Sequence, residues 1–426
     1  MGEPVFDIAV IGLGYIGLPT AATFASRGQV VAGVDVNRDT VDAVNRGEVP
    51  FVEPELGSAV SEAVSAGLLK AFTDVPEAHA YIIAVPTPIT DSKDIDLSYL
   101  RGAAEHLAPV LRGGELVILE STSPPGTTEK LAHFLERERP DLRFGEDAAD
   151  TVHVAHSPER VLPGRIMVEI VSNDRVVGGL TNAAGQRAKK LYGIICQGQI
   201  YVTDAATAEM TKIAENSFRD LNIAFANQLS LMCEGLDVSV WELIELANHH
   251  PRVNILQPGP GVGGHCIAVD PWFLVSAFPE HSSVTRAARE LNDSMPANVV
   301  RRIQRELQDR ENATVALLGL TFKANVDDSR ESPAVRVVEL LAAAMPMTRL
   351  LGVDPHVETV PGPLQTLANF CLESETDKAV QAADLVVLLV DHAEFLHLRL
   401  SDQSQVIDTR GVWGRTSRNS DATSTA

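Results

Sequence analysis

The chain has no hydrophobic run long enough to cross a membrane, and charged residues make up 22% of its 426 positions. It is also poor in basic residues: 35 Lys and Arg against 57 Asp and Glu give a net charge of −22. Such a charge disfavours binding to nucleic acid or to an anionic membrane surface. We therefore expect neither as a partner, and we expect any anionic substrate to need a local cationic pocket.

Cysteine is scarce, with four residues in the whole chain. Cys196, Cys233, Cys266 and Cys371 show neither CxxC pairing nor the spacing of zinc ligands, so we expect no metal site. The N-terminal residues, which include Glu3, lead straight into a strand and do not resemble a signal peptide. A reduced, cytoplasmic setting is the simplest expectation. A chain of 426 residues is too long to fold around one hydrophobic core, so we expect two or three domains.

A glycine-rich turn near the N-terminus carries the first specific pattern. It follows the apolar strand Phe6–Ile11, precedes a helix over Leu18–Arg27, and consists of Gly12, Leu13, Gly14, Tyr15, Ile16 and Gly17. In dinucleotide-binding folds these glycines make the tight turn, admit the pyrophosphate and let helix and strand pack closely. The next strand ends in Asp35, which suits the ribose hydroxyls of NAD, although Arg38 nearby leaves NADP open. The pattern predicts a Rossmann domain that binds NAD; the alternative is a chance glycine turn in another α/β protein.

Two threonines follow later strands of the same region. Thr87 comes after the strand Ala80–Val85, and Thr122 comes after the strand Leu116–Glu120. Ligands of open parallel sheets bind beyond the carboxyl ends of the strands, so each hydroxyl could reach cofactor or substrate. Helix capping or turn formation is the alternative role for both residues.

A long helix is expected over Asp204–Leu236, which contains no proline and has apolar residues at helical spacing. Lys212 and Asn216 lie four residues apart and therefore on one face of it. Lys212 is a candidate catalytic residue; the alternative is a surface ion pair with Glu209 or Glu215.

The segment Gly263–Asp270 holds a thiol, Cys266, in a glycine-rich turn, with a carboxylate four residues later. Glycine lets the backbone take positive φ and approach a ligand closely. A cysteine in such a turn is a candidate nucleophile; the alternative is an inert, buried apolar residue.

A second strand–helix array begins after residue 311, with strand Thr314–Leu320, helix Ala334–Ala343 and a last strand over Val406–Gly411. It has no second GxGxxG turn, so we expect it to bind something other than a second dinucleotide. The fold class expected is α/β, with two Rossmann-like, doubly wound parallel-sheet domains joined by a long central helix. The expected domains are 1–203 for NAD, 204–311 for the central helical and dimerisation region, 312–414 for the substrate nucleotide, and 415–426 as a disordered tail.

Seven motifs occur in an order that resembles the UDP-sugar 6-dehydrogenase family along nearly the whole chain. They are GLGYIGLP, VPTP, STSPPGTT, SPERVLPG, KIAENSFRDLNIAFANQ, HHPRVNILQPGPGVGGHCIAVDP and LTFKANVDDSRESP. The resemblance is to the UDP-glucose and UDP-N-acetylmannosamine dehydrogenases, and it is greatest to the UDP-N-acetylmannosamine subgroup. Val269 and Pro163 stand where UDP-glucose enzymes carry Lys and a second Glu, although UDP-N-acetylglucosamine remains a possible substrate.

The resemblance implies a four-electron oxidation of the sugar C6 hydroxyl to a carboxylate, using NAD twice. Cys266 would form a thiohemiacetal and then a thioester, which water hydrolyses. The implied catalytic residues are Cys266, Lys212, Asp270, Asn216, Glu159 and Thr122, the last of which would also contact cofactor and hold a water.

The resemblance also assigns binding residues. Arg330 and Thr87 would contact the cofactor. The UDP-sugar would be bound by Arg160, Val161, Lys212, Asn216, Arg219, His250, Arg252, Gly263, Lys323 and Arg410. His250 and Arg252 resemble a loop that reaches into a neighbouring subunit, which implies a homodimer.

Three alternatives to this function stay open. The first is a UDP-N-acetylglucosamine or UDP-glucose 6-dehydrogenase. The second is a two-electron hydroxyacid or polyol dehydrogenase in which Cys266 is inert. The third is a nucleotide-sugar-binding protein without catalysis, against which the joint presence of Cys266, Lys212, Asn216 and Asp270 speaks.

Overall fold

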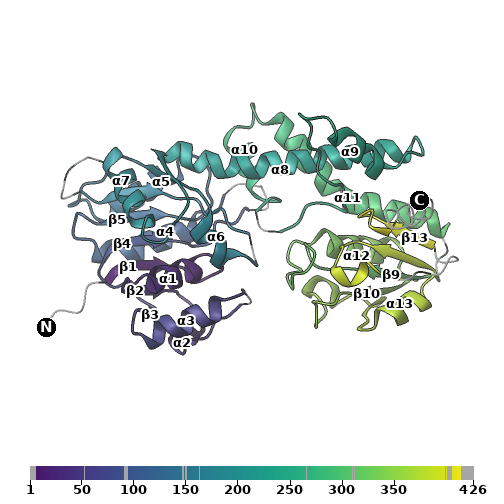
Figure 1. The fold of residues 1–426 in the computed structure, drawn as a ribbon, viewed down its shortest axis with the longest axis horizontal. Helices are drawn as coiled ribbons and strands as arrows, with labels where there is room; N and C mark the ends of the chain where they lie inside the picture. The colour runs from purple at the N-terminus through teal and green to yellow at the C-terminus, as the bar shows by residue number, and fades with distance from the viewer. Residues whose placement is uncertain are drawn as a thin grey trace, which may run out of the picture. The chain divides into compact units, whose positions relative to one another are not determined.

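The computed structural model describes residues 6–51, 53–90, 95–145, 148, 151–162, 164–264, 266–308, 310, 312–398, 400 and 405–413. The chain divides into two compact units, Met1–Glu215 and Asn216–Ala426 (Figure 1). The tail 415–426, for which we expected disorder, lies outside the described residues, as do Pro163 and His265. The division into four segments stays a prediction.

The N-terminal unit is built on a sheet whose described strands follow the order β3-β2-β1-β4-β5-β6-β7-β8. Its strands are β1 (Phe6–Ile11), β2 (Val31–Val34), β3 (Leu69–Phe72), β4 (Ala78–Ile83), β5 (Leu116–Leu119), β6 (His153–His156), β7 (Arg175–Gly179) and β8 (Ile200–Asp204). Neighbouring strands pair in parallel except β6 and β7, which are antiparallel. The sequence pattern predicted the parallel part of the sheet and did not anticipate this reversal.

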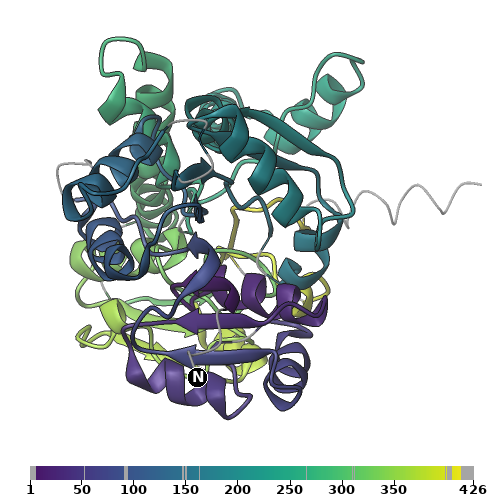
Figure 2. The ribbon, with the colours of Figure 1, turned by 90° about the vertical axis from the view of Figure 1, so that its left-hand side faces the viewer.

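Helices cover both faces of this sheet, so its strands are apolar on both sides (Figure 2). One face packs against α1 (Gly17–Ser26), α2 (Arg38–Asn45), α3 (Leu56–Ser65), α6 (Ile166–Ser172) and α7 (Asn182–Tyr192). The other packs against α4 (Ser98–Leu107), α5 (Thr127–Glu138) and the short η1 (Ala108–Val110). Because β1, β2, β4 and β5 are parallel, their carboxyl ends lie at the same edge of the sheet.

The long helix expected from the sequence is α8 (Ala205–Glu234), which begins in the first unit and ends in the second. It is followed by α9 (Val240–Asn248), α10 (Asp270–Ala277) and α11 (Ser283–Leu307). None of the helices in the described ranges has both the length and the apolar character needed to cross a membrane.

The second unit contains a parallel sheet whose described strands follow the order β11-β10-β9-β12-β13. The strands are β9 (Thr314–Leu318), β10 (Arg349–Val353), β11 (Phe370–Leu372), β12 (Leu385–Leu388) and β13 (Gln405–Asp408). Its faces are covered by α11, α12 (Pro333–Ala344) and η2 (Gly362–Leu364) on one side, and by α13 (Thr376–Ala382) and η3 (Ala393–Phe395) on the other (Figure 1). The expected fold class, two Rossmann-like domains with a long central helix, is confirmed.

Candidate functional site

The glycine-rich turn between β1 and α1 has no room for a side chain at Gly12 or Gly17, but it has open space at Gly14. Gly12 has φ +96°, and a Cβ there would lie 2.5 Å from the carbonyl oxygen of Ala84. A Cβ on Gly17 would lie 1.8 Å from the carbonyl oxygen of Gly12. A Cβ on Gly14, by contrast, would meet nothing within 4 Å. The turn is thus closed toward the protein and open at Gly14, as an approaching pyrophosphate requires.

Aromatic and apolar residues complete this turn. The ring of Tyr15 stacks on Phe51 with centroids 4.2 Å apart. Ile16 directly precedes α1, whose first residue is Gly17. Because α1 begins directly after the turn, its first backbone N–H groups lie beside the turn, in the arrangement that binds phosphate.

Asp35 lies just past β2, at the position expected for the ribose contact. One carboxylate oxygen, Oδ2, accepts the backbone N–H of Leu13 at 2.9 Å, and Oδ1 accepts the N–H of Asn37 at 2.9 Å. Arg38 begins α2 and is exposed. The Asp35 carboxylate beside the open glycine turn fits the ribose and pyrophosphate of NAD.

The loops after β4 and β5 are joined to each other. Thr87 Oγ1 donates to the carbonyl oxygen of Thr122 at 2.7 Å, and Ser121 Oγ donates to that of Val85 at 2.6 Å. The hydroxyl of Thr87 thus fixes the loop that carries Thr122. The assignment of both threonines to the cofactor site stays a prediction.

A buried glutamate of α8 holds the segment that follows Thr122. Glu209 accepts hydrogen bonds from Gly126 N (2.6 Å), Thr128 N (2.7 Å) and Thr128 Oγ1 (2.6 Å) at the start of α5. Burial raises the pKa of the Glu209 carboxyl above 4.5, although these donors oppose the shift. The first turns of α8 are thereby fixed against the STSPPGTT loop within the N-terminal unit.

Lys212 is buried in α8, three residues after Glu209. Glu215, the other partner considered for it, makes a two-pronged pair with Arg160: Nε to Oε2 at 2.9 Å and Nη2 to Oε1 at 2.6 Å. Since both carboxylates have other partners, the alternative of a surface pair for Lys212 loses its support.

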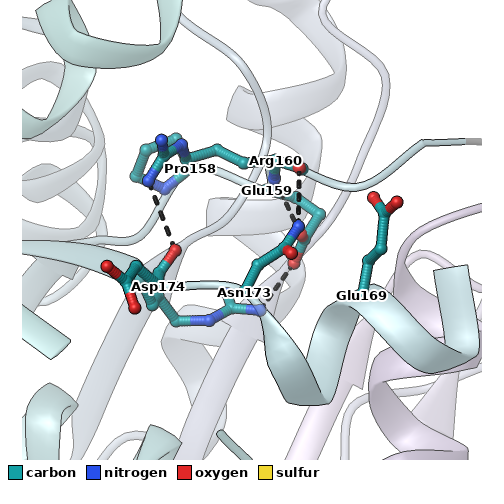
Figure 3. A pocket seen from close by; sticks show the side chains of 7 residues that line it. Pro158, Glu159, Arg160, Glu169, Asn173 and Asp174 are labelled. Carbon is teal, nitrogen blue, oxygen red and sulfur yellow. Dashed lines mark hydrogen bonds and ion pairs between the residues drawn. The ribbon is translucent and has the colours of Figure 1, made fainter. Parts of the chain in front are cut away.

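The SPERVLPG loop leaves β6 and places Glu159 in a buried position. Its Oε1 accepts the N–H of Arg160 at 2.7 Å, and its Oε2 pairs with Arg175 Nη2 at 2.7 Å. Figure 3 shows Glu159 and Arg160 beside Asn173 and Asp174 around a small cavity of about 10 Å³. This volume suits about one water and no sugar. Val161, next in the loop, packs against the core of the sheet.

The thiol turn lies in the second unit, at the start of α10. Cys266 is exposed, and its carbonyl oxygen accepts the N–H of Asp270 at 2.8 Å. Asp270 is buried, and Asn216 Nδ2 of α8 donates to its Oδ2 at 2.5 Å. Three of the expected catalytic residues, Cys266, Asp270 and Asn216, are therefore brought together.

The glycines of this turn pack directly on the second βα array. A Cβ on Gly263 would lie 2.5 Å from the carbonyl oxygen of Glu331 and 2.5 Å from Pro333 Cδ. Gly264 has φ +83°, and a Cβ there would lie 3.0 Å from the ring of Phe322. The glycines at the start of the thiol turn are thus packed against the segments LTFK and DDSRESP, which lie far from them in the sequence.

The remaining cationic candidates differ in their ion pairs and in their exposure to solvent. Arg410 Nε pairs with Asp391 at 2.9 Å, and its guanidinium lies against Gly259, where a Cβ would be 2.5 Å from Nη1. Arg330 forms a fork with Asp328, with distances of 2.9 and 2.7 Å. The other candidates are exposed: Arg219, His250, Arg252 and Lys323.

From the sequence we missed the buried charges Glu120 and Arg175, and we considered Glu209 only as a surface partner of Lys212, whereas Glu209 is buried. Glu120 directly follows the apolar strand β5, and Arg175 is the first residue of β7. A charge at the end of a buried strand needs a partner, which was the available signal.

The chain matches three domains of one family. The NAD binding domain of the UDP-glucose/GDP-mannose dehydrogenase family matches residues 6–196, the central domain 206–294 and the UDP binding domain 316–415. The expected cofactor, NAD, and the expected resemblance are thereby confirmed.

Named relatives cover almost the whole chain. The NDP-N-acetyl-D-galactosaminuronic acid dehydrogenase of Ralstonia nicotianae is 51% identical over 411 residues, which are 95% of this chain and 96% of that protein. The UDP-N-acetyl-D-mannosamine dehydrogenase of Escherichia coli is 50% identical over 418 residues, with coverage of 95% and 99%.

A solved structure, the UDP-D-ManNAc dehydrogenase of Pyrococcus horikoshii, is 40% identical with a TM-score of 0.86 and covers 95% of each chain. From the domain matches, the identities and the glycine turn that fits NAD, the chain belongs to the UDP-glucose/GDP-mannose dehydrogenase family and is an NAD-dependent UDP-sugar dehydrogenase.

Proposed function

We propose that this protein oxidises the C6 hydroxyl of a UDP-N-acetylhexosamine, with UDP-N-acetylmannosamine as the leading candidate, to the UDP-aminouronate. The relatives support an N-acetylated substrate, because those at 50% and 51% identity are named for N-acetylmannosamine and N-acetylgalactosaminuronic acid. The alternative substrates are UDP-N-acetylglucosamine and UDP-glucose.

The observation that carries the mechanism is the exposed side chain of Cys266. A hydrogen bond between the two backbones joins this residue to the buried Asp270. NAD, when bound, accepts one hydride in each of two successive oxidations. Between them the Cys266 thiolate attacks the C6 aldehyde, so that a carbon–sulfur bond forms and the carbonyl oxygen takes a proton. Loss of the second hydride and of that proton leaves a thioester. Water then adds to the thioester carbon and gives up its two protons, one to the residue that activates it and one to solvent, while the carbon–sulfur bond breaks and the carboxylate and the thiolate are released.

Each of the other polar residues has a role that its contacts support. Lys212 and Asn216, one turn apart in α8, would stabilise the oxyanions that develop on the C6 oxygen. Lys212 or a water beside it would take the hydroxyl proton in the first oxidation. Asp270 and Glu159 would position or activate the hydrolytic water, which the Thr122 hydroxyl would also hold.

Binding of the UDP group is assigned to cationic side chains. A guanidinium suits a diphosphate because its fork donates two hydrogen bonds at once. Against a net charge of −22, these cations must create the local positive field that attracts the substrate. The cationic residues proposed are Arg160, Arg219, Lys323 and Arg410, with His250 and Arg252 contributed to a neighbouring subunit. Val161 and Gly263 are proposed to contact the UDP-sugar without a charge, and Arg330 is proposed for the cofactor phosphate.

We propose a homodimer formed through the exposed apolar side of α8. Phe218, Phe225 and Met232 recur every seven residues along the helix and are 70%, 46% and 52% exposed. Seven residues are two helical turns, so the three side chains lie in one row. A row of this kind marks an association surface. Sedimentation of a Phe218→Glu variant tests it: the variant should be monomeric where the wild type is a dimer.

The function is tested by counting NADH formed per sugar consumed, for a panel of UDP-hexoses. Two NADH per sugar and preference for an N-acetylated sugar are expected. Cys266→Ser should make no acid, while the matched control Cys371→Ser, another exposed cysteine, should behave as the wild type.

Each alternative predicts a different result. One NADH per sugar would replace the proposal with a two-electron dehydrogenase. Binding of UDP-sugar and NAD without turnover would replace it with a binding protein. Turnover confined to UDP-glucose would overturn the N-acetylated substrate while keeping the chemistry. Turnover confined to UDP-N-acetylglucosamine would overturn UDP-N-acetylmannosamine as the substrate within the same class.

A further inference from the structure

Three charged side chains are buried together where β5 ends, β7 begins and the loop leaves β6. Glu120, Glu159 and Arg175 are 1%, 8% and 4% exposed. Arg175 Nη1 lies 3.3 Å from Glu120 Oε1, and Nη2 lies 2.7 Å from Glu159 Oε2. One guanidinium therefore serves two carboxylates on different loops.

Other elements complete the cluster. Glu120 also accepts from Tyr192 Oη of α7 at 3.0 Å and from Thr20 Oγ1 of α1 at 3.1 Å. The Tyr192 ring lies 4.3 Å from the Arg175 guanidinium carbon, within the range of a cation–π contact. The charged and titratable groups facing Glu120 are thus Arg175, Glu159 and Tyr192, from three separate elements.

The cluster contains one cation and two carboxyls, so its members respond differently to protons. Burial raises the pKa of Glu120 to about 7, and the neighbouring Glu159 adds to this while Arg175 opposes it. Burial alone would lower the pKa of Arg175, but Glu159, Tyr192 and Glu120 outweigh it and the pKa is raised. Arg175 therefore stays charged, and Glu120 is the member that changes its protonation near neutral pH.

We propose that Arg175 is a positioning residue for the hydrolysis of the thioester, and that Glu120, through this shared guanidinium, links the rate of that step to pH. The inference rests on the proposed function, in which Glu159 positions or activates the water. The Glu159 carboxylate is held from both sides, by Arg160 N on Oε1 and Arg175 on Oε2. These two bonds fix its orientation and leave lone pairs to accept from a water.

The direction of the pH effect follows from the shared guanidinium. An ionised Glu120 accepts a charge-assisted hydrogen bond from Arg175 Nη1 and so anchors the guanidinium whose Nη2 holds Glu159. A protonated Glu120 binds Arg175 more weakly, so the guanidinium is anchored less firmly and positions the Glu159 carboxylate less well. Hydrolysis should therefore accelerate as the pH rises through about 7, where Glu120 ionises.

The test measures hydrolysis separately from hydride transfer in single turnovers. NADH absorbance follows the two oxidations, and mass spectrometry of the quenched enzyme follows the thioester on Cys266. Arg175→Lys keeps the positive charge and loses the two guanidinium nitrogens that contact Glu120 and Glu159 together. It should slow hydrolysis about ten- to hundredfold and leave NADH formation and the KM for UDP-sugar within about twofold. The control is Arg165→Lys, whose exposed guanidinium pairs with Glu169 and which should match the wild type.

Glu120→Gln and Tyr192→Phe test the pH dependence of hydrolysis, which would not change if the cluster around Arg175 were purely structural. Both should fold, because each replacement has nearly the shape of the original. Glu120→Gln should flatten the rise in hydrolysis between about pH 6 and pH 8, because the amide has no proton to lose in that range. Tyr192→Phe removes a hydrogen bond to the Glu120 carboxylate and should shift the rise to higher pH.

Distinct results overturn the two proposals. If Arg175→Lys slows hydride transfer and hydrolysis alike, Arg175 is structural and this inference is wrong. If Arg175→Lys does not fold, an unchanged pH profile in Glu120→Gln overturns it, and a flattened one supports it. If Cys266→Ser still makes acid, the proposed function itself is wrong, whatever the Arg175 variants do.

Discussion

The contact between Glu209 and the start of α5 gives the most direct test of the site's architecture. The carboxylate is 1% exposed and accepts three hydrogen bonds of 2.6–2.7 Å from Gly126 and Thr128. In Glu209→Ala these donors lose their acceptor, and the two donors of Thr128 are buried. Hydrogen bonds to a charged group contribute about 1.5–3 kcal/mol each and are not additive, so we expect a loss of about 3–5 kcal/mol.

The assay is urea unfolding followed by circular dichroism, with the free energy extrapolated to water. Glu209→Gln keeps one acceptor oxygen but turns an amide N–H₂ toward N–H donors, so its loss should be smaller, about 2 kcal/mol. Glu105→Gln on the exposed side of α4 is the matched control and should stay within about 0.5 kcal/mol of the wild type.

The result that would refute this reasoning is a Glu209→Ala protein within about 1 kcal/mol of the wild type. An equal loss in the Glu105→Gln control would refute it too, because the effect would then not depend on the contact with α5. Since Lys212 follows one turn later in α8, Glu209→Gln should also lower kcat more than it raises KM.

Three further predictions follow from close contacts. Gly17→Ala places a methyl group 1.8 Å from the Gly12 carbonyl oxygen and should raise the Kd for NAD about ten- to hundredfold, as measured by calorimetry. Gly263→Ala meets a backbone oxygen at 2.5 Å and should slow alkylation of the neighbouring thiol by iodoacetamide, with the circular dichroism spectrum unchanged. Asp354→Asn should lose about 1–3 kcal/mol in urea unfolding, since His392 Nε2 lies 3.1 Å from its carboxylate. Burial alone would raise the pKa of Asp354, but the hydrogen bonds lower it below 3.8, so wild-type stability should fall as the pH drops below about 4, and this fall should be smaller in the asparagine variant.

The sequence predicted the parts of the site that depend on local pattern. The turn from Gly12 to Gly17 and the acid at Asp35 follow from a strand, a turn and a helix within one unit of about thirty residues. The long helix α8 follows from spacing and the lack of proline, and its ends agree with Asp204–Leu236 to within about two residues.

Contacts between distant segments could not be predicted in this way. Arg175 and Glu120 are 55 residues apart, and each alone is a charged residue beside an apolar strand. The antiparallel pairing of β6 with β7 could not be predicted either, because buried parallel and antiparallel strands have similar composition. Equally, nothing local in Gly263 indicates that Glu331 and Pro333 occupy the space beside it.

Asp35 has a consequence for changing the coenzyme preference of this enzyme. Its carboxylate is the acceptor for the amide of Leu13, inside the glycine turn, as well as the expected neighbour of the ribose. A designer who replaces it with alanine to admit a 2′-phosphate would also release the turn that holds the pyrophosphate. Serine or asparagine, which offer the Leu13 amide an oxygen without a negative charge, are therefore the better starting points.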